Sequence, residues 1–154
     1  MKLYLARHGD YTVDLVKQLD VLTDLGINQI TKIANCLKQA NIQVANIYHS
    51  NKHRAEQTAA LLAKGVHCDQ NIQLYSGINP NDEIAAFVNE IPHWDKDVLV
   101  VGHQPFMNKL VSHLIVGNEN KNIIDFHTGT VACIEGIDRE RWIINWVITP
   151  ALFL

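Results

Sequence analysis

Short runs of apolar residues alternate along this chain with segments in which apolar residues recur every three or four positions. Residues 3–6 form the first run and end abruptly in Arg7-His8-Gly9. Residues 97–101 form the most hydrophobic run and end at Gly102 and His103. Apolar runs of this length with glycine at one end predict strands that are buried on both faces of a sheet. A shorter β-prone segment at 46–49 predicts a strand between them.

The intervening segments predict helices. Thr23 is suited to an N-cap, and the apolar spacing that follows it predicts an amphipathic helix over residues 24–40. Ser50 or Asn51 is expected to cap a second helix from Lys52 to about Lys64, which Gly65 ends. Two further helices are predicted, one opened by residues 80–83 that ends near Glu90 and is terminated by Pro92, and one over 106–116 with Pro105 in its first turn.

The rest of the chain is assigned to loops and to two late strands. Residues 10–14 are polar without a clear period, residues 66–80 are irregular apart from a brief strand at 72–74, and residues 117–122 form a polar loop. Residues 130–134 and 142–147 predict two antiparallel strands. The order of elements indicates one α/β domain over residues 1–154, a three-layer sandwich with a mixed, mostly parallel sheet flanked by helices.

Composition narrows the functional class. Apolar residues make up 47% of the chain, but no stretch reaches the roughly 20 apolar residues that span a bilayer. The net charge is −3, and the basic residues are scattered, which argues against a nucleic-acid or membrane partner. Three widely spaced cysteines favour reduced thiols over disulfides. The N-terminal segment lacks an apolar signal region, so we expect a cytoplasmic protein.

Two predicted strands end in histidine, and this is where the candidate chemistry gathers. Because the carboxyl ends of parallel strands share one edge of a sheet, His8 and His103 should lie close together there. Arg7 and Arg54, which follow the first and second strands, should join them. Two guanidinium groups, a nucleophilic imidazole and a second imidazole are suited to hold a tetrahedral phosphoryl group.

The sequence resembles the histidine phosphatase superfamily, and within it the small SixA-type phosphohistidine phosphatases. The resemblance covers nearly the whole chain, and it is carried by these residues: Arg7-His8-Gly9-Asp10, Leu22-Thr23 with Gly26, Ser50, Arg54-Ala55-Glu56-Gln57-Thr58, Val98-Leu99-Val100-Val101-Gly102-His103-Gln104-Pro105, and Asn145-Trp146 with Pro150. It implies a phosphoglycerate-mutase-like fold and an enzyme that needs no cofactor or metal.

The resemblance also implies roles for individual residues. His8 becomes phosphorylated, Arg7 and Arg54 bind the phosphoryl oxygens, and His103 neutralises developing charge. Gly9 and Ser50 are expected to contribute to substrate binding. The loop that carries His127 is placed near the site, which makes His127 a further candidate for contact with substrate.

Two departures from the family pattern stand out. Asn51 occupies a position where the family usually has proline. Larger members carry an acidic residue that protonates the leaving group, whereas residues 74–80 contain no carboxylate here. Asp82 and Glu83 are possible substitutes, although carboxylates at the start of a helix also stabilise it through its dipole.

The preferred hypothesis is a protein phosphohistidine phosphatase that acts on a phosphotransfer domain of a signalling relay. The alternatives are a phosphatase for small phosphate esters or anhydrides in the same superfamily and a non-catalytic phosphate-binding module. No metal site is expected, because His49 and His53 lack a third ligand. His67, His93 and His113 are interpreted as surface residues.

Overall fold

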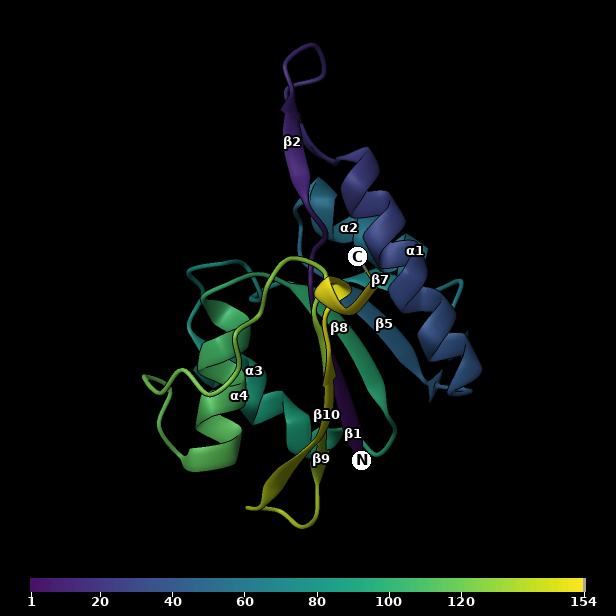
Figure 1. Cartoon of the computed structure of the whole chain (residues 1–154). Coiled ribbons are helices and arrows are strands. Elements are labelled where there is room, and N and C mark those ends of the chain that lie inside the picture. The colour runs from purple at the N-terminus through teal and green to yellow at the C-terminus, as the bar shows by residue number, and fades with distance from the viewer. Residues whose placement is uncertain (154) are drawn as a thin grey trace.

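The computed structural model describes residues 1–153, and its centre is a six-stranded sheet in the order β10-β9-β1-β8-β5-β7 (Figure 1). Its strands are β1 (Lys2–Arg7), β5 (Asn46–His49), β7 (Ile72–Leu74), β8 (Val98–Gly102), β9 (Val131–Gly136) and β10 (Trp142–Ile148). The pairs β1–β8, β8–β5 and β5–β7 are parallel, whereas β9 pairs antiparallel with β1 and β10. The predicted α/β class and mixed, mostly parallel sheet are confirmed.

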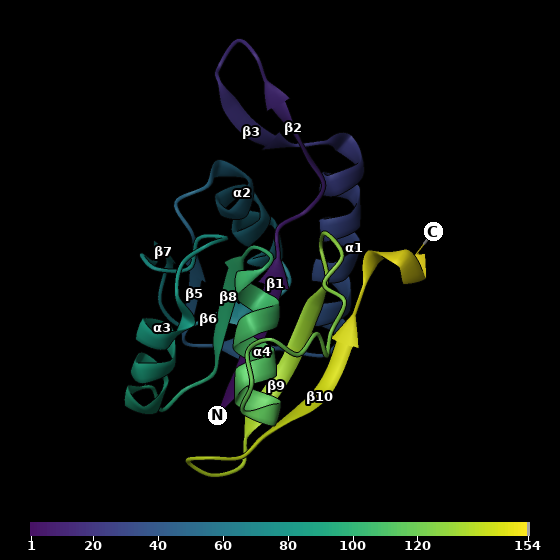
Figure 2. The same ribbon diagram turned by 90° about the vertical axis from the view of Figure 1, so that its left-hand side faces the viewer.

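Helices cover both faces of the sheet (Figure 2). In β1, Leu3 and Leu5 pack into one core cluster with residues of α3 (Ile84–Glu90) and α4 (Phe106–Val116). Tyr4 and Ala6 face the opposite way and pack with residues of α1 (Asp24–Gln39) and α2 (His53–Leu62). This period of two in a strand that is buried on both faces produces the three predicted layers.

Both helices α1 and α4 match their predicted spans. The Thr23 hydroxyl caps α1 by accepting a hydrogen bond from the Gly26 backbone N–H at 3.0 Å. Helix α4 begins directly after Pro105 and ends at Gly117, whose left-handed backbone (φ 70°) is a common helix stop. Helix α3 ends at Glu90, as predicted, and Pro92 lies in the 3-10 helix η1 (Ile91–His93) that follows it.

Helix α2 is shorter than predicted and lacks the expected cap. Its N-cap is Lys52, which makes no side-chain capping bond, and its last residue lies before Gly65. The expectation of a Ser50 or Asn51 cap was wrong, and the Ser50 hydroxyl instead contacts His103. Gly65 serves packing, since a Cβ there would lie 2.0 Å from the Ala34 carbonyl oxygen of α1.

The sequence analysis missed a β-hairpin directly after the first strand. Residues 10–14 were assigned to a polar stretch, but β2 (Tyr11–Asp14) pairs antiparallel with β3 (Leu19–Leu22). This hairpin extends beyond the body of the molecule (Figures 1 and 2). Two short parallel strands, β4 (Gln43–Val44) and β6 (His67–Cys68), and the 3-10 helix η2 (Pro150–Phe153) were also missed.

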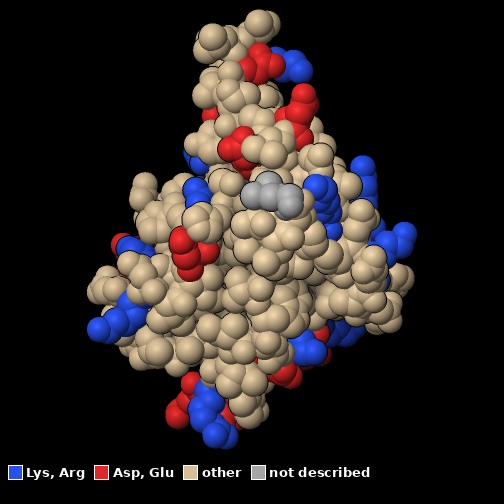
Figure 3. Space-filling model, in the orientation of Figure 1, with Lys and Arg blue, Asp and Glu red and all other residues tan. Residues whose placement is uncertain are grey.

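Charges of both signs are dispersed over the visible face of the molecule (Figure 3). Cys36, Cys68 and Cys133 are all free thiols, as expected, and Cys133 is buried. Within residues 1–153, no helix combines the length and the apolar character that crossing a membrane requires.

Candidate active site

The two predicted histidines meet at the carboxyl ends of the adjacent strands β1 and β8. The backbone N–H of His8 donates to the carbonyl of Gly102 at 3.1 Å, which continues the register of the sheet into the site. As a result, the rings of His8 and His103 lie with their centroids 5.0 Å apart. Both side chains are almost fully buried, at 3% and 1% exposure.

One ring nitrogen of His8 is already committed. Its Nδ1 lies 2.8 Å from the carbonyl oxygen of Gly9, so Nδ1 carries the proton and donates it. Burial lowers the pKa of His8 to about 4, and the neighbouring guanidinium groups of Arg54 and Arg7 act in the same direction. At neutral pH the ring is therefore uncharged, and Nε2 carries the free lone pair.

His103 is held by the residue that was expected to cap α2. The Ser50 hydroxyl lies 2.5 Å from His103 Nε2, while Nδ1 is buried without a hydrogen-bond partner within residues 1–153. Burial, and to a lesser degree the proximity of His8, lower the pKa of His103 to about 3. Ser50 therefore positions the second imidazole in this structure.

Arg54 lies in the first turn of α2 and has two partners from the hairpin. Its Nη1 forms an ion pair with the carboxylate of Asp20, and its guanidinium lies over the ring of Tyr11, 4.5 Å from the centroid. The Tyr11 ring also contacts His8 edge-on, at a centroid distance of 5.2 Å. The hairpin thus forms one wall of the site, with Tyr11 and Asp20 as functional candidates that the sequence analysis missed.

Arg7 approaches the same edge from the end of β1. Its Nη1 donates to the carbonyl of Phe126 at 2.8 Å, which ties the guanidinium to the loop before β9. Burial lowers the pKa of Arg7, whereas the nearby carboxylate of Asp125 acts in the opposite direction. The Nε atoms of Arg7 and Arg54 have no partner in the described part of the chain, so both groups retain donors for an oxyanion.

Thr58, in the second turn of α2, holds the segment that follows His8 through hydrogen bonds. The Thr58 hydroxyl donates to the carbonyl of Arg54 at 2.8 Å and accepts from the Gly9 backbone N–H at 3.0 Å. The backbone N–H of Gly9, a residue predicted to contribute to substrate binding, is thus bound to Thr58. Gly9 also allows close packing, because a Cβ there would lie 2.9 Å from Ile30.

The remaining candidates lie apart from these contacts. His127 is exposed, and its Nε2 lies 3.0 Å from the carboxylate of Asp125. Asp82 accepts a hydrogen bond from the Asn79 backbone N–H at 2.7 Å, and Glu83 is the N-cap residue of α3 without a side-chain capping bond. Asp82 therefore has a local partner just before the helix, whereas the Glu83 side chain makes no capping bond at the helix start.

Among residues 1–153, no three histidine, cysteine or acidic side chains cluster in an arrangement that could hold a metal ion. His49 Nδ1 instead donates to the carbonyl of Ser50 at 2.8 Å. His53 Nδ1 lies 3.3 Å from the carboxylate of Glu56. The positive charge of the site is supplied by the two arginines.

Comparisons with known proteins find relatives over nearly the whole length of the chain. The chain is 27% identical to an uncharacterized protein of Picosynechococcus sp., over 94% of this chain and 96% of the relative. It is 23% identical to the phosphohistidine phosphatase SixA of Escherichia coli, over 97% and 94% of the two chains. A solved structure of the protein histidine phosphatase SixA complexed with tungstate matches with a TM-score of 0.87 and 21% identity, covering 100% of both chains.

The family assignment rests on the segment that contains the first strand, the hairpin, α1 and α2. A model of the histidine phosphatase superfamily (branch 1) matches residues 3–79, which is half of the chain. This segment includes Arg7, His8, Ser50 and Arg54. The chain therefore belongs to the histidine phosphatase superfamily, branch 1, and within it resembles the SixA-type enzymes.

Proposed function

We propose that this protein is a protein phosphohistidine phosphatase that acts through a phosphorylated His8. The observation that supports the proposal is that His8 is a neutral imidazole whose Nε2 lone pair is free. Its Nδ1–H is bound to the Gly9 carbonyl, its lowered pKa keeps the ring neutral, and two guanidinium groups lie beside it. An uncharged imidazole with a free Nε2 next to oxyanion-binding groups has the properties of a nucleophile for phosphoryl transfer.

In the first step, the Nε2 lone pair of His8 attacks phosphorus in line with the scissile P–N bond of the substrate. The phosphorylated imidazole of the substrate carries a proton from solvent on its other ring nitrogen. A new P–N bond forms to His8 as the old one breaks, and the substrate imidazole leaves as a neutral ring with the bonding electron pair. Arg7 and Arg54 bind the equatorial oxygens, and the neutral imidazole of His103 adds a hydrogen-bond donor beside them.

In the second step, water attacks the phosphorus of phosphorylated His8. The P–N bond to His8 breaks, the imidazole recovers its lone pair, and inorganic phosphate is released after water has lost a proton. The same arginines stabilise this step, since the phosphoryl group remains in place while only the group at its apical position changes.

The carboxylates next to the site support phosphohistidine rather than an ester as the substrate. Asp20 forms an ion pair with Arg54, so its carboxylate is already engaged with a guanidinium group. Imidazole is a far weaker base than an alkoxide and leaves without the help of a general acid. Similarity to a phosphohistidine phosphatase favours the same choice. A phosphotransfer domain of a signalling relay is the expected protein substrate.

The test is to trap the intermediate. The enzyme is mixed for milliseconds with a phosphotransfer domain that carries labelled phosphohistidine, and is then quenched in alkaline detergent, because phosphohistidine is labile in acid. Label should appear on wild-type enzyme and be absent from the His8→Ala variant, whereas the His67→Ala variant, which alters an exposed histidine, should match wild type. Label on the His8→Ala enzyme would refute the assignment of the nucleophile. If the enzyme hydrolyses only sugar phosphates or phosphorylated amino acids, this result would support the ester alternative.

A further inference from the structure

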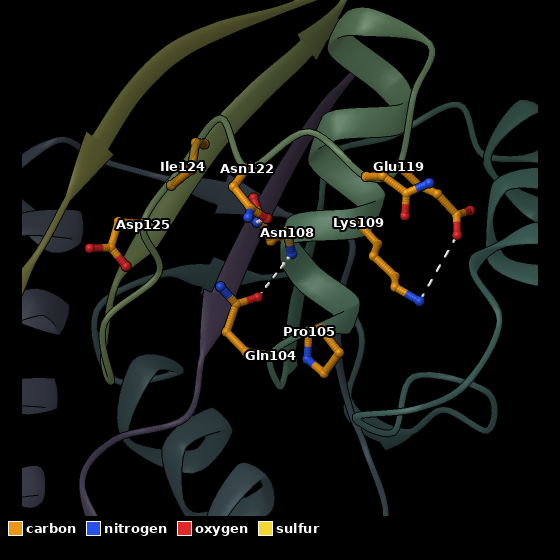
Figure 4. A pocket seen from close by; sticks show the side chains of 9 residues that line it. Gln104, Pro105, Asn108, Lys109, Glu119, Asn122, Ile124 and Asp125 are labelled. Atoms are coloured by element: carbon orange, nitrogen blue, oxygen red, sulfur yellow. Dashed lines mark hydrogen bonds and ion pairs between the residues drawn. The ribbon is translucent and has the colours of Figure 1, made fainter.

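A pocket of about 540 Å³ lies beside α4 (Figure 4). Two of its lining residues connect it to the catalytic groups. Gln104 directly follows His103, and Asp125 directly precedes Phe126, whose carbonyl accepts the hydrogen bond from Arg7. A molecule whose phosphoryl group is bound by Arg7 can therefore extend into this pocket.

Four amide side chains line the pocket: Gln104, Asn108, Asn120 and Asn122. Gln104 Oε1 accepts from the Asn108 backbone N–H at 3.0 Å, and Asn108 Nδ2 donates to Asn122 Oδ1 at 2.5 Å. Figure 4 shows these side chains gathered along the first turns of α4 and the loop beside it. These bonds occupy one end of the Gln104 and Asn122 amides and leave their NH₂ groups for other partners.

The strongest indication of a ligand is Asn108 itself. Its side chain is only 8% exposed, and its Oδ1 atom is buried without any hydrogen-bond partner within residues 1–153. A buried acceptor without a partner is unfavourable and uncommon in folded proteins. A donor that enters the pocket from a substrate would satisfy it.

The charged residues of the pocket each have a polar neighbour. Lys109 Nζ lies 3.9 Å from the Glu119 carboxylate, and Asp125 contacts His127. The amides offer both donors and an acceptor, which suits a neutral ligand that also carries both.

The peptide group is such a ligand, because each one presents one N–H donor and one carbonyl acceptor. We propose that this pocket binds main-chain amide groups of the polypeptide that flanks the phosphohistidine in a protein substrate. Asn108 Oδ1 accepts from a substrate N–H, and the NH₂ groups of Gln104 and Asn122 donate to substrate carbonyls. This inference rests on the proposed function and gives the enzyme a way to prefer phosphorylated proteins over the free phosphorylated amino acid.

The test compares two probes that carry a non-hydrolysable phosphoryl-triazole analogue of phosphohistidine. One probe is the analogue of the side chain alone, without any peptide group, and the other places it within a capped peptide of about ten residues. Binding is measured by calorimetry for wild type, Asn122→Ala and Asn108→Leu, with Asn28→Ala on the exposed face of α1 as the control. Asn122 is exposed, so its variant keeps the test valid if Asn108→Leu folds poorly.

The wild type should bind the peptide at least tenfold more tightly than the single analogue. Each pocket variant should lose about tenfold in Kd for the peptide, as expected for the loss of one or two hydrogen bonds, with no change for the single analogue. Asn28→Ala should match wild type with both probes.

Three results would overturn the inference. The first is equal affinity of the wild type for both probes. The second is an equal loss for both probes in Asn122→Ala, which would make the role of the amides merely structural. The third is a match between the pocket variants and the wild type with both probes. The proposed function fails differently, through a wild-type enzyme that hydrolyses no phosphohistidine at all. If the wild type hydrolyses phosphohistidine but the pocket variants match it in affinity for both probes, only the role of the pocket is refuted.

Discussion

Asp20 in β3 and Arg54 in the first turn of α2 form an ion pair at the wall of the active site. The two residues are 34 positions apart, and the hairpin brings them together while the ring of Tyr11 lies against the same guanidinium. The carboxylate holds Arg54 in place, but it also offsets part of the positive charge that a bound phosphoryl group needs. Asp20 therefore limits how tightly the site retains an oxyanion.

Replacing Asp20 by asparagine should strengthen the binding of inorganic phosphate. Removing a negative charge beside the guanidinium should lower the inhibition constant of phosphate by about three- to tenfold, a size expected for charges that are partly exposed to water. Asp14→Asn, on the same hairpin but paired only with its own turn, is the control. An unchanged or raised constant for Asp20→Asn would show that the carboxylate acts only to orient Arg54.

The contact between Ser50 and His103 predicts a graded loss of activity. His103→Ala should lower kcat by ~10²–10³-fold, the usual effect of losing one preorganised electrostatic group. Ser50→Ala leaves the imidazole present and removes only the partner of Nε2, so its effect should be closer to about tenfold. Single-turnover kinetics with labelled phosphoprotein will measure both steps. Equal losses in the two variants would mean that Ser50 does more than position His103.

The two buried histidines predict that the fold loses stability in mild acid. The pKa of His8 is lowered to about 4 and that of His103 to about 3, from 6.5 in the unfolded chain. Below pH 6.5 the unfolded chain therefore takes up protons that the folded chain does not, and the free energy of unfolding falls as pH decreases towards 4. For His8 alone this amounts to about 2 kcal/mol between pH 7 and pH 5.

Urea unfolding at these two pH values will test this. The His8→Asn variant should lose less stability between pH 7 and pH 5 than the wild type, because asparagine does not titrate. His67→Asn, at an exposed position, should lose as much as the wild type. If His8→Asn and wild type lose the same amount, His8 is not held neutral by the fold.

The approach of His8 and His103 was predictable from the sequence because it follows from sheet geometry. Both residues directly follow strongly apolar strands, and strands β1 and β8 pair in parallel, so their carboxyl ends share one edge. Arg54 was predictable for a related reason, since it begins the helix that follows β5. In each case a local signal and a general rule of α/β sheets were sufficient.

The contribution of the hairpin could not be predicted in the same way. Tyr11, Thr12 and Val13 are all exposed, so β2 lacks the alternation of buried and exposed residues that reveals a strand. The role of Asp20 depends on a tertiary contact with Arg54 that leaves no local pattern. The start of α2 was misplaced for a similar reason, because the Ser50 hydroxyl contacts His103 rather than an N–H group of the helix.

Lysine should be a poor replacement for Arg54. The guanidinium binds Asp20 through Nη1 and stacks on Tyr11, and it still presents further N–H groups for a phosphoryl oxygen. An ammonium group keeps the charge but cannot maintain these separate contacts. Arg54→Lys should therefore lower kcat/KM by roughly a hundredfold or more, in the range for loss of a preorganised donor. Arg139→Lys, at the exposed turn between β9 and β10, is the matched control and should retain full activity.

The choice between phosphohistidine and ester substrates depends on the leaving group. An alkoxide must receive a proton because its conjugate acid has a pKa comparable to the ~15.7 of water, whereas imidazole, with a pKa near 6.5, is protonated by solvent. Asp20 is ion-paired with Arg54, and Asp82 accepts a hydrogen bond in its own turn, so neither is placed as a proton donor. General acid catalysis is usually worth ~10²–10⁴-fold. We therefore expect kcat/KM for phosphohistidine to exceed that for phosphoserine by roughly a hundredfold or more.

The same reasoning predicts that Asp82→Asn and Glu83→Gln each retain most of their activity on phosphohistidine. Both substitutions preserve size and hydrogen-bonding capacity, so they remove only the ability to donate or accept a proton. Steady-state kinetics on phosphohistidine and phosphoserine peptides of the same sequence will test both variants. Suppose the wild type cleaved both peptides equally fast and one substitution abolished only ester cleavage. That residue would then be a general acid, and the ester-phosphatase alternative would replace the function proposed above.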